Sequence, residues 1–408
     1  MYNSYLNRDK FNYLFKIYLT FLGILGFYHL FLKHTGGADS TISEWLINYQ
    51  GGFTKRGIIG EICFTIAKFF GLKLRFIIYL FQVLTLGTYF FFLYHFIKTI
   101  KINYLILLII FSPIFLLYPF AELEVLARKE VFIFIGLIIF FNLNNINSNK
   151  KHDILFVIFI LPLLVLIWEP VIFFIGFFYL SLLIKYKIKN FQKSVTMLTP
   201  FLPAIIIAFY IAFNPITAEN HLILENSLKE NFNEICYMSC SFLLHKSSIT
   251  DQFTSNIHLY SVEIFIRYFL IILIGFGPLL IVSKNSKMVE DIYFFNLFKD
   301  LFYLTIILMS PLFLLLAMGS DWGRWVHISY TYSVLFFIHL IKNKIIILDF
   351  NFFNRFKSKN NKKYIFVIFF IIFAFGWNPK TSLTGDVGSF PGYRVPYYFF
   401  KTVFNNFD

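Results

Sequence analysis

Charged residues are scarce in this sequence. They make up 14% of the 408 residues, whereas hydrophobic residues make up 58%. Soluble globular domains carry about 25% charged residues. The mean hydropathy of +0.70 points the same way. Water is therefore not the main solvent of this chain, and its recurring apolar runs of about 20 residues predict helices that cross a membrane.

Alternation of polar and apolar residues is also lacking. The runs 269–282 and 362–377 are apolar on every side, whereas strands of a transmembrane barrel alternate lipid-facing and lumen-facing residues. The sequence therefore predicts an all-α fold, a polytopic bundle of transmembrane helices.

Several common signatures are absent. There is no Walker loop, HExxH motif, nucleophile elbow or dinucleotide fingerprint. The formal charge of +14 comes from lysines between the apolar runs, so it indicates membrane topology and no nucleic-acid partner. No small-x-small cleavage site follows the first apolar run, so we read the first 33 residues as a retained signal anchor.

Cysteine is scarce, with Cys63, Cys236 and Cys240 alone. The last two lie in a stretch that we expect outside the cytoplasm, where a disulfide could form; their spacing equally allows two free thiols. No cluster of metal ligands accompanies them. The sequence identifies no cofactor and leaves a divalent cation open.

Eleven apolar runs are long enough to be read as spans. A twelfth segment, 57–72, is short and carries Glu61 and Lys68, so it is either a span or a helix lying in the membrane interface. The eleven runs are 13–32, 76–97, 103–120, 131–146, 154–168, 170–184, 195–213, 264–283, 301–318, 326–341 and 364–377.

The positive-inside rule decides the topology. If 57–72 is interfacial and the N-terminus is cytoplasmic, most of the basic residues between the spans fall on the cytoplasmic side. They are Arg8, Lys10, Lys98, Lys101, Lys150, Lys151, Lys185, Lys187, Lys189, Lys193, Lys284, Lys287, Lys299, Lys342, Lys344, Arg355, Lys357, Lys359, Lys362 and Lys363. We therefore expect a single integral domain, 1–408, in the plasma membrane, with eleven spans and a cytoplasmic N-terminus. The extracytoplasmic segments are then 33–75, 121–130, 168–170, 214–263, 319–325 and the tail 378–408.

Ionisable residues gather in four of these outer segments, close to apolar spans where charge is costly and is usually retained for function. Each also has a structural interpretation. The first loop can be a solvated interfacial loop, Glu124 and Arg128 can form a helical ion pair, Glu169 can reach interfacial water beside Pro170, and the tryptophans beside Asp321 and Arg324 can be belt anchors. The candidate site residues are Asp39, Glu44, Lys55, Arg56, Glu124, Arg128, Lys129, Glu169, Asp321 and Arg324.

This layout resembles the GT-C superfamily of membrane glycosyltransferases. The resemblance rests on Asp39 and Glu44 after the first span, on GGFTKRGIIGEI as a second interfacial helix, and on the basic ARKE and DWGRW segments. Asp39 is followed by Ser-Thr-Ile-Ser instead of the aromatic pair of many members, and no soluble C-terminal domain follows the spans.

The resemblance implies transfer of a sugar from a polyprenyl-phosphate or polyprenyl-diphosphate donor to a glycan acceptor that is lipid-linked or on the cell surface. Asp39 or Glu44 would deprotonate the acceptor hydroxyl, and Arg128, Lys129 or Arg324 would balance charge on the departing lipid phosphate. We expect neutralising Glu44 to cost little folded protein, because an outer-loop carboxylate contributes little to packing. An O-antigen-type polymerase fits the same residues. The alternative from another class is a transporter or flippase that uses Glu169, Asp321 and Arg324.

Overall fold

The described part of the chain is mostly helical, with almost no sheet. The computed structural model describes residues 7–36, 40–145, 150–244, 254, 256–289, 301–348, 362–383 and 400–405. Within these residues the only sheet is a pair of three-residue antiparallel strands, β1 (Ser286–Met288) and β2 (Ile346–Leu348). The predicted helical fold is confirmed.

Among the residues that the structure describes, five helical stretches are long and apolar enough to cross a membrane. Three shorter apolar stretches, Glu130–Leu143, His152–Ile167 and Tyr364–Phe375, accompany them. This content is compatible with a membrane protein, while the number of eleven spans stays a prediction. The five stretches are α1 (Arg8–Thr35), α4 (Leu74–Ile97), Phe191–Phe213, α16 (Val262–Lys284) and α18 (Leu301–Met318).

Large apolar side chains are exposed on these stretches. Ile24 of α1 is 59% exposed, Phe213 is 78% exposed and Phe269 of α16 is 64% exposed. A soluble monomer rarely exposes apolar surface on this scale, so such faces are those expected to contact lipid.

The chain forms two compact units. We call residues 23–96 and 124–248 the loop unit, because it contains the first expected outer loop, and residues 1–22, 97–123 and 249–408 the tail unit. Helix α1 begins in the tail unit and continues in the loop unit.

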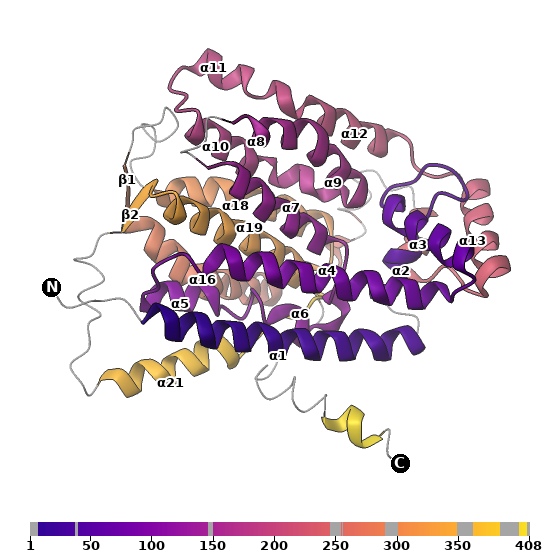
Figure 1. Ribbon diagram of the computed structural model, residues 1–408, viewed down its shortest axis with the longest axis horizontal. Helices are drawn as coiled ribbons and strands as arrows, with labels where there is room; N and C mark the ends of the chain where they lie inside the picture. The colour runs from indigo at the N-terminus through magenta and orange to yellow at the C-terminus, as the bar shows by residue number, and fades with distance from the viewer. Residues whose placement is uncertain are drawn as a thin grey trace. The chain divides into compact units, whose positions relative to one another are not determined.

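The loop unit is built from short and long helices (Figure 1). Besides α4 and most of α1, its helices are α2 (Ser40–Leu46), α3 (Gly57–Phe70), α7 (Glu130–Leu143), α8 (His152–Leu155), the π-helix η2 (Phe156–Ile160), α9 (Leu161–Ile167), the 3-10 helix η3 (Glu169–Phe174), α10 (Ile175–Lys185), α11 (Phe191–Thr196), η4 (Thr199–Phe201), α12 (Leu202–Phe213), α13 (Ala218–Phe232), α14 (Met238–Ser241) and η5 (Phe242–Leu244). The short 3-10 helix η1 (Leu123–Val125) lies at the boundary between the units.

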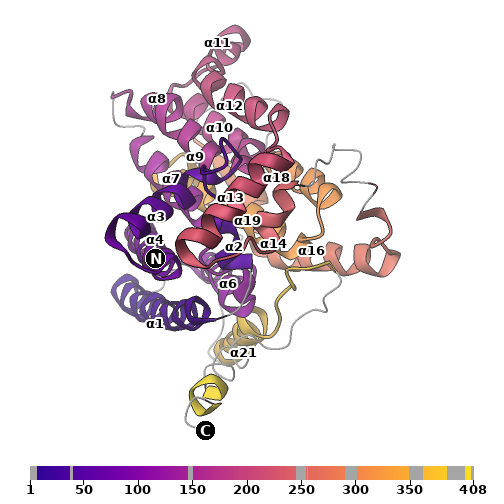
Figure 2. The same cartoon turned by 90° about the vertical axis from the view of Figure 1, so that its right-hand side faces the viewer.

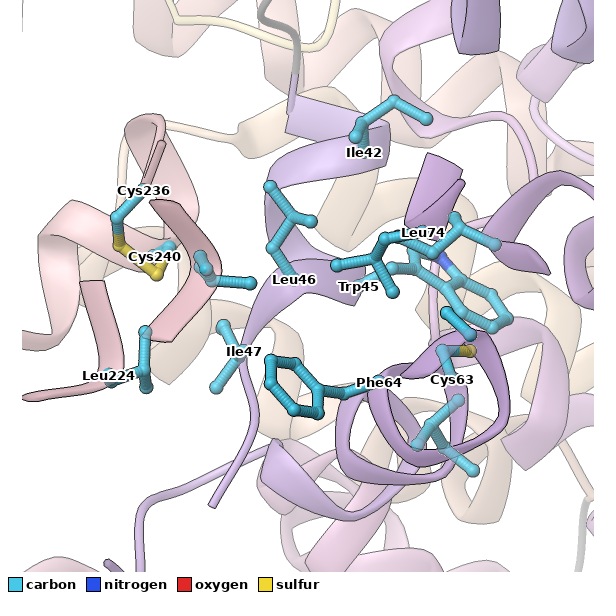
Figure 3. Close-up of a cluster of buried hydrophobic side chains, with 14 of the residues drawn as sticks. Ile42, Trp45, Leu46, Ile47, Cys63, Phe64, Leu74, Leu224, Cys236 and Cys240 are labelled. Carbon is cyan, nitrogen blue, oxygen red and sulfur yellow. A yellow bond between two sulfur atoms is a disulfide. The ribbon is translucent and has the colours of Figure 1, made fainter. Parts of the chain in front are cut away.

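Helices α2, α3, α13 and α14 share a hydrophobic core at one end of α4 (Figure 1 and Figure 2). Trp45 and Phe64 are at most 2% exposed, and burying side chains of this size contributes about 1.5–3 kcal/mol each. Figure 3 shows Leu46 and Ile47 between Phe64 on one side and a disulfide on the other. Gly60 allows α3 to approach this core closely, since a Cβ there would lie 1.8 Å from the Ile47 carbonyl oxygen. Their packing fixes the position of α2.

The tail unit is organised around α19 (Trp322–Lys342), in which nearly every side chain is buried. Helices α16 and α18 both pack against it, and α5 packs against α16. The unit also contains α5 (Tyr104–Ile110), α6 (Tyr118–Ala121), the strands β1 and β2, and α21 (Lys362–Phe375).

The prediction that residues 103–120 form one membrane-spanning helix is wrong. The run 103–120 forms α5, which ends at Ile110, and the four-residue α6. Seven helical residues extend only about 10 Å, far less than the roughly 30 Å of a bilayer core. Pro113 is the physical reason, because proline lacks an N–H and disfavours helix in the residue before it. The break expected at Trp168–Pro170 is confirmed, because α9 ends at Ile167 and η3 begins at Glu169.

Candidate functional site

Glu44 is the centre of a buried charge network in the loop unit. It lies on α2, whose seven residues are all buried, and it is itself 0% exposed. Its Oε1 accepts from Nη1 of Arg56 at 3.1 Å, and its Oε2 accepts from Nε of Arg128 at 2.9 Å. An ionised carboxylate is very costly to bury without such partners. The two arginines are the partners that compensate the burial of the Glu44 carboxylate.

Arg56 links this carboxylate to a second one. Arg56 directly precedes α3 and has a backbone φ of 62°. Its Nε and Nη2 donate to the two carboxylate oxygens of Glu169, each at 2.7 Å. This forked pairing is the strong form of a charge-assisted hydrogen bond. Burial alone raises the pKa of Glu169, but the positive charge of Arg56 and its hydrogen bonds outweigh burial and lower the pKa below its ordinary value.

Lys129, the residue directly before α7, is the fifth member of the network. It is 0% exposed, and its Nζ donates to the backbone carbonyl of Arg56 at 2.5 Å. Burial lowers the pKa of Lys129 to about 8, against the opposing attraction of Glu44. The five residues thus combine three cationic side chains with two carboxylates. The net charge is +1 when the Lys129 amine is protonated and zero when it is not.

Only one edge of the network is accessible. The side chains of Arg56 and Glu169 are 18% and 22% exposed, and Lys55, the preceding residue, is exposed. Glu44, Arg128 and Lys129 lie behind this edge. A ligand would therefore meet the Arg56–Glu169 pair with Lys55 beside it, and the inner residues would act on it through charge and position.

Five of the residues predicted from the sequence lie together in this network, and they come from three segments of the chain. They are Glu44, Arg56, Arg128, Lys129 and Glu169. Lys55 is exposed at the edge, and Asp39 lies outside the described residues. Glu124, in η1, is exposed, and its backbone carbonyl accepts from Ser40 Oγ at 3.2 Å. The alternative of a helical Glu124–Arg128 pair is wrong. The chain is not helical there, since Ala127 has φ of 51°, and the guanidinium of Arg128 reaches Glu44 instead.

The expectation that Glu44 contributes little to packing is also wrong, because this residue is fully buried and doubly paired. Sequence reasoning missed the residues that support α2. Trp45 donates from Nε1 to the Ala127 carbonyl at 3.1 Å, which ties α2 to the segment that carries Arg128. Ser43 Oγ donates to the Tyr237 carbonyl at 2.7 Å. An acidic residue followed by Trp-Leu-Ile was the available signal that this helix enters a core.

A disulfide between Cys236 and Cys240 closes the turn that carries α14. The Cys240 N–H donates to Ser43 Oγ at 3.1 Å, so the turn is hydrogen-bonded to the residue beside Glu44. Of the two alternatives left open by the sequence, the bonded form is the one found.

The remaining predicted residues lie in the tail unit. Arg324 is 4% exposed, and its Nη1 lies 3.4 Å from Oδ2 of Asp321, with its guanidinium over the Trp325 ring. Glu122, which sequence reasoning left outside the site, accepts from Nζ of Lys380 at 3.0 Å. Its carboxylate also accepts from the Thr381 N–H at 3.3 Å and from the Asn378 amide at 3.2 Å. Glu122 therefore holds the segment after α21 in place.

Comparison with protein-family models, with curated proteins and with solved structures finds no match to this chain. What defines the molecule is then its own content: a helical chain with several membrane-length apolar helices and a buried, net cationic network beside α2.

Proposed function

We propose that the protein is a membrane glycosyltransferase that takes a sugar or glycan from a polyprenyl-phosphate or polyprenyl-diphosphate donor on the extracytoplasmic side. The observation that carries the proposal is the buried network of Glu44, Arg56, Arg128, Lys129 and Glu169. Its surplus positive charge lies behind one accessible edge, in surroundings where charge interacts more strongly than in water. Such a site suits a reaction that leaves negative charge on a lipid phosphate.

The two candidate carboxylates take different roles. Glu44 is buried, and its two carboxylate oxygens are paired with two guanidinium groups, so its role here is to anchor Arg56 and Arg128. Asp39, one residue before α2, is the general base in this proposal. A divalent cation bound to the donor phosphate would leave the roles of Asp39 and Glu44 unchanged.

The proposed step moves one proton and exchanges one bond. The acceptor hydroxyl gives its proton to the Asp39 carboxylate, and its oxygen forms a bond to the anomeric carbon of the sugar. The bond between that carbon and the donor phosphate oxygen breaks, and the lipid phosphate leaves with the electron pair. Arg56, with Lys129 behind it, balances the charge that develops on the phosphate.

The proposed topology keeps the plasma membrane, eleven crossings and a cytoplasmic N-terminus. Residues 104–121 would cross as a broken helix. Irregular backbone is tolerated at membrane depth only where protein covers it, and residues 112–118 are all buried. The Cys236–Cys240 disulfide supports an extracytoplasmic 214–263 segment, because disulfides persist in oxidising compartments.

A deletion strain tests the proposal. Mass spectrometry of surface glycans and polyprenyl-linked intermediates should show a missing product and an accumulated lipid-linked donor. The parental gene should restore the product, Asp39→Asn should not, and Asp9→Asn, at the exposed start of α1, should restore it fully. Glycans and intermediates unchanged by the deletion would overturn the proposal. Accumulation of a small polar solute, with normal glycans, would favour a transporter.

A further inference from the structure

A cavity of about 700 Å³ lies in the loop unit, away from the charge network. It is bounded by the end of α1, the turn between α3 and α4, the first turn of α4 and the end of α13. Its volume is within the range of pockets that bind small molecules, about 300–1,000 Å³. None of the five network residues lines it. Its polar lining is formed by His34, Thr35, Lys73, Arg75 and Glu234.

The charge of this lining is positive. Arg75 pairs with Glu234 through Nε to Oε1 at 2.6 Å and through Nη2 to Oε2 at 3.0 Å, and its guanidinium lies over the Tyr237 ring. That pairing fixes Arg75 and cancels one charge. Lys73, which is exposed, remains as the surplus cation. It immediately precedes the first residue of α4, where the helix dipole adds further positive potential.

The chain turns sharply to place Lys73 there. Helix α3 ends at Phe70, and Gly71 has φ of 63°, a conformation that favours glycine. The Leu72 N–H then donates to the Ala67 carbonyl at 2.9 Å, which closes the turn. Lys73 is therefore held at the mouth of the cavity by the backbone itself.

Two apolar residues that line the cavity, Leu72 and Phe76, are 41% and 38% exposed. Phe69 and Phe70, the last two residues of α3 before the turn that leads to the cavity, are 81% and 65% exposed. Aromatic side chains left this open beside a cationic cavity are suited to an amphiphile. They can contact its chain while the cavity holds its head.

The cavity also lies at a suitable depth. It adjoins the end of α1 and the start of α4, two helices of membrane-spanning length. Their 28 and 24 residues extend about 42 and 36 Å, beyond the roughly 30 Å hydrocarbon core. Their ends therefore reach the level of lipid headgroups.

We infer that this cavity binds the phosphate headgroup of a lipid whose apolar chain lies along Phe69, Phe70 and Phe76. Lys73 and the first turn of α4 contact the phosphate, and Arg75 is held by Glu234 as the inner wall. Two sources share this chemistry: a prenyl phosphate and an ordinary anionic phospholipid. The inference does not depend on the proposed transfer reaction, because the site uses none of its residues.

The test measures the binding of lipid and control compounds to the purified full-length protein in a neutral detergent, by native mass spectrometry. The probes are geranylgeranyl phosphate, phosphatidylglycerol, geranylgeraniol and inorganic phosphate. We expect one or both phosphate-bearing lipids to bind more tightly than the alcohol or inorganic phosphate. Preference for geranylgeranyl phosphate identifies a prenyl-phosphate site, and equal binding of the two lipids identifies a general phospholipid site.

Variants assign the binding to this cavity. Lys73→Gln should weaken lipid binding roughly tenfold or more, as expected for loss of one charge-assisted contact, and Lys73→Arg should retain it. Lys68→Gln is the matched control, because Lys68 is exposed on α3 but does not line the cavity. Equal weakening by Lys68→Gln and Lys73→Gln, unchanged binding in Lys73→Gln, or inorganic phosphate that binds as tightly as the lipids would overturn the inference.

Discussion

Replacing Glu44 by glutamine tests whether the network is buried and coupled as described. The change keeps the shape of the side chain but removes its charge. Arg56 keeps Glu169 as a partner, whereas the guanidinium of Arg128, on a residue only 5% exposed, loses its carboxylate. Removing one partner of a buried pair typically costs about 3–5 kcal/mol, because an uncompensated charge is left behind. We expect Glu44→Gln to lower the free energy of unfolding by about that amount.

The measurement is a denaturant titration of the purified protein in mixed micelles. Arg128→Met should restore part of the loss when combined with Glu44→Gln, with a coupling energy of roughly 0.5–3 kcal/mol. The control is Glu263→Gln, which removes an exposed pair with Arg267 on α16 and should cost about 0–1 kcal/mol. A Glu44→Gln protein as stable as this control would refute a buried network.

Lys129 has its pKa lowered from 10.5 to about 8 in the folded protein, so the cost of burying its charge is present in full below about pH 8. That cost, about 3 kcal/mol, is relieved as pH rises from 8 to 10.5. The free energy of unfolding of the parent, relative to that of Lys129→Met, should therefore rise over that window. A difference between the two proteins that does not change with pH would contradict a buried amine. Gly60→Ala should destabilise the protein by about 1–3 kcal/mol or more, because the added Cβ would lie 1.8 Å from a backbone carbonyl oxygen, while Gly277→Ala, with open space around it, should not; equal stability of the two would argue against the close approach of α3. Cysteine at Asn231 should react with an impermeant thiol reagent from outside intact cells and cysteine at Asn190 should not, both positions being exposed; the reverse pattern would invert the proposed topology.

The residues of the network could be predicted from the sequence, but their pairing could not. Charge is rare in this chain, so carboxylates and guanidinium groups beside apolar runs stood out, and a common face could be inferred from lysines elsewhere. The choice of Glu44 as the partner of Arg128 depends on the path of the backbone at Ala127, which has φ of 51°. Its alternative partner, Glu124, is nearer in sequence.

For the helices, too, some features could be predicted from the sequence and others could not. Composition identified the long apolar helices α1, α4, α16 and α18, because a continuous apolar run leaves few other structures. The break in 103–120 was missed because hydropathy averages over Pro113, whose effect is local. The burial of α2 was missed for a different reason. Its serines and Glu44 are polar, and only the partners supplied by distant segments make their burial possible.

The most direct test of the proposed chemistry follows the lipid product, which is the same whatever sugar is transferred. The lipid-linked pool from a deletion strain, with its acceptors, would be incubated with the purified protein in detergent, and free polyprenyl phosphate or diphosphate would be measured by mass spectrometry. We predict that the parental protein releases the free lipid phosphate as the glycosylated acceptor forms, and that Asp39→Asn, folded to the same extent, releases none. Release that is no greater with the parental protein than with Asp39→Asn would contradict glycosyl transfer by this chain.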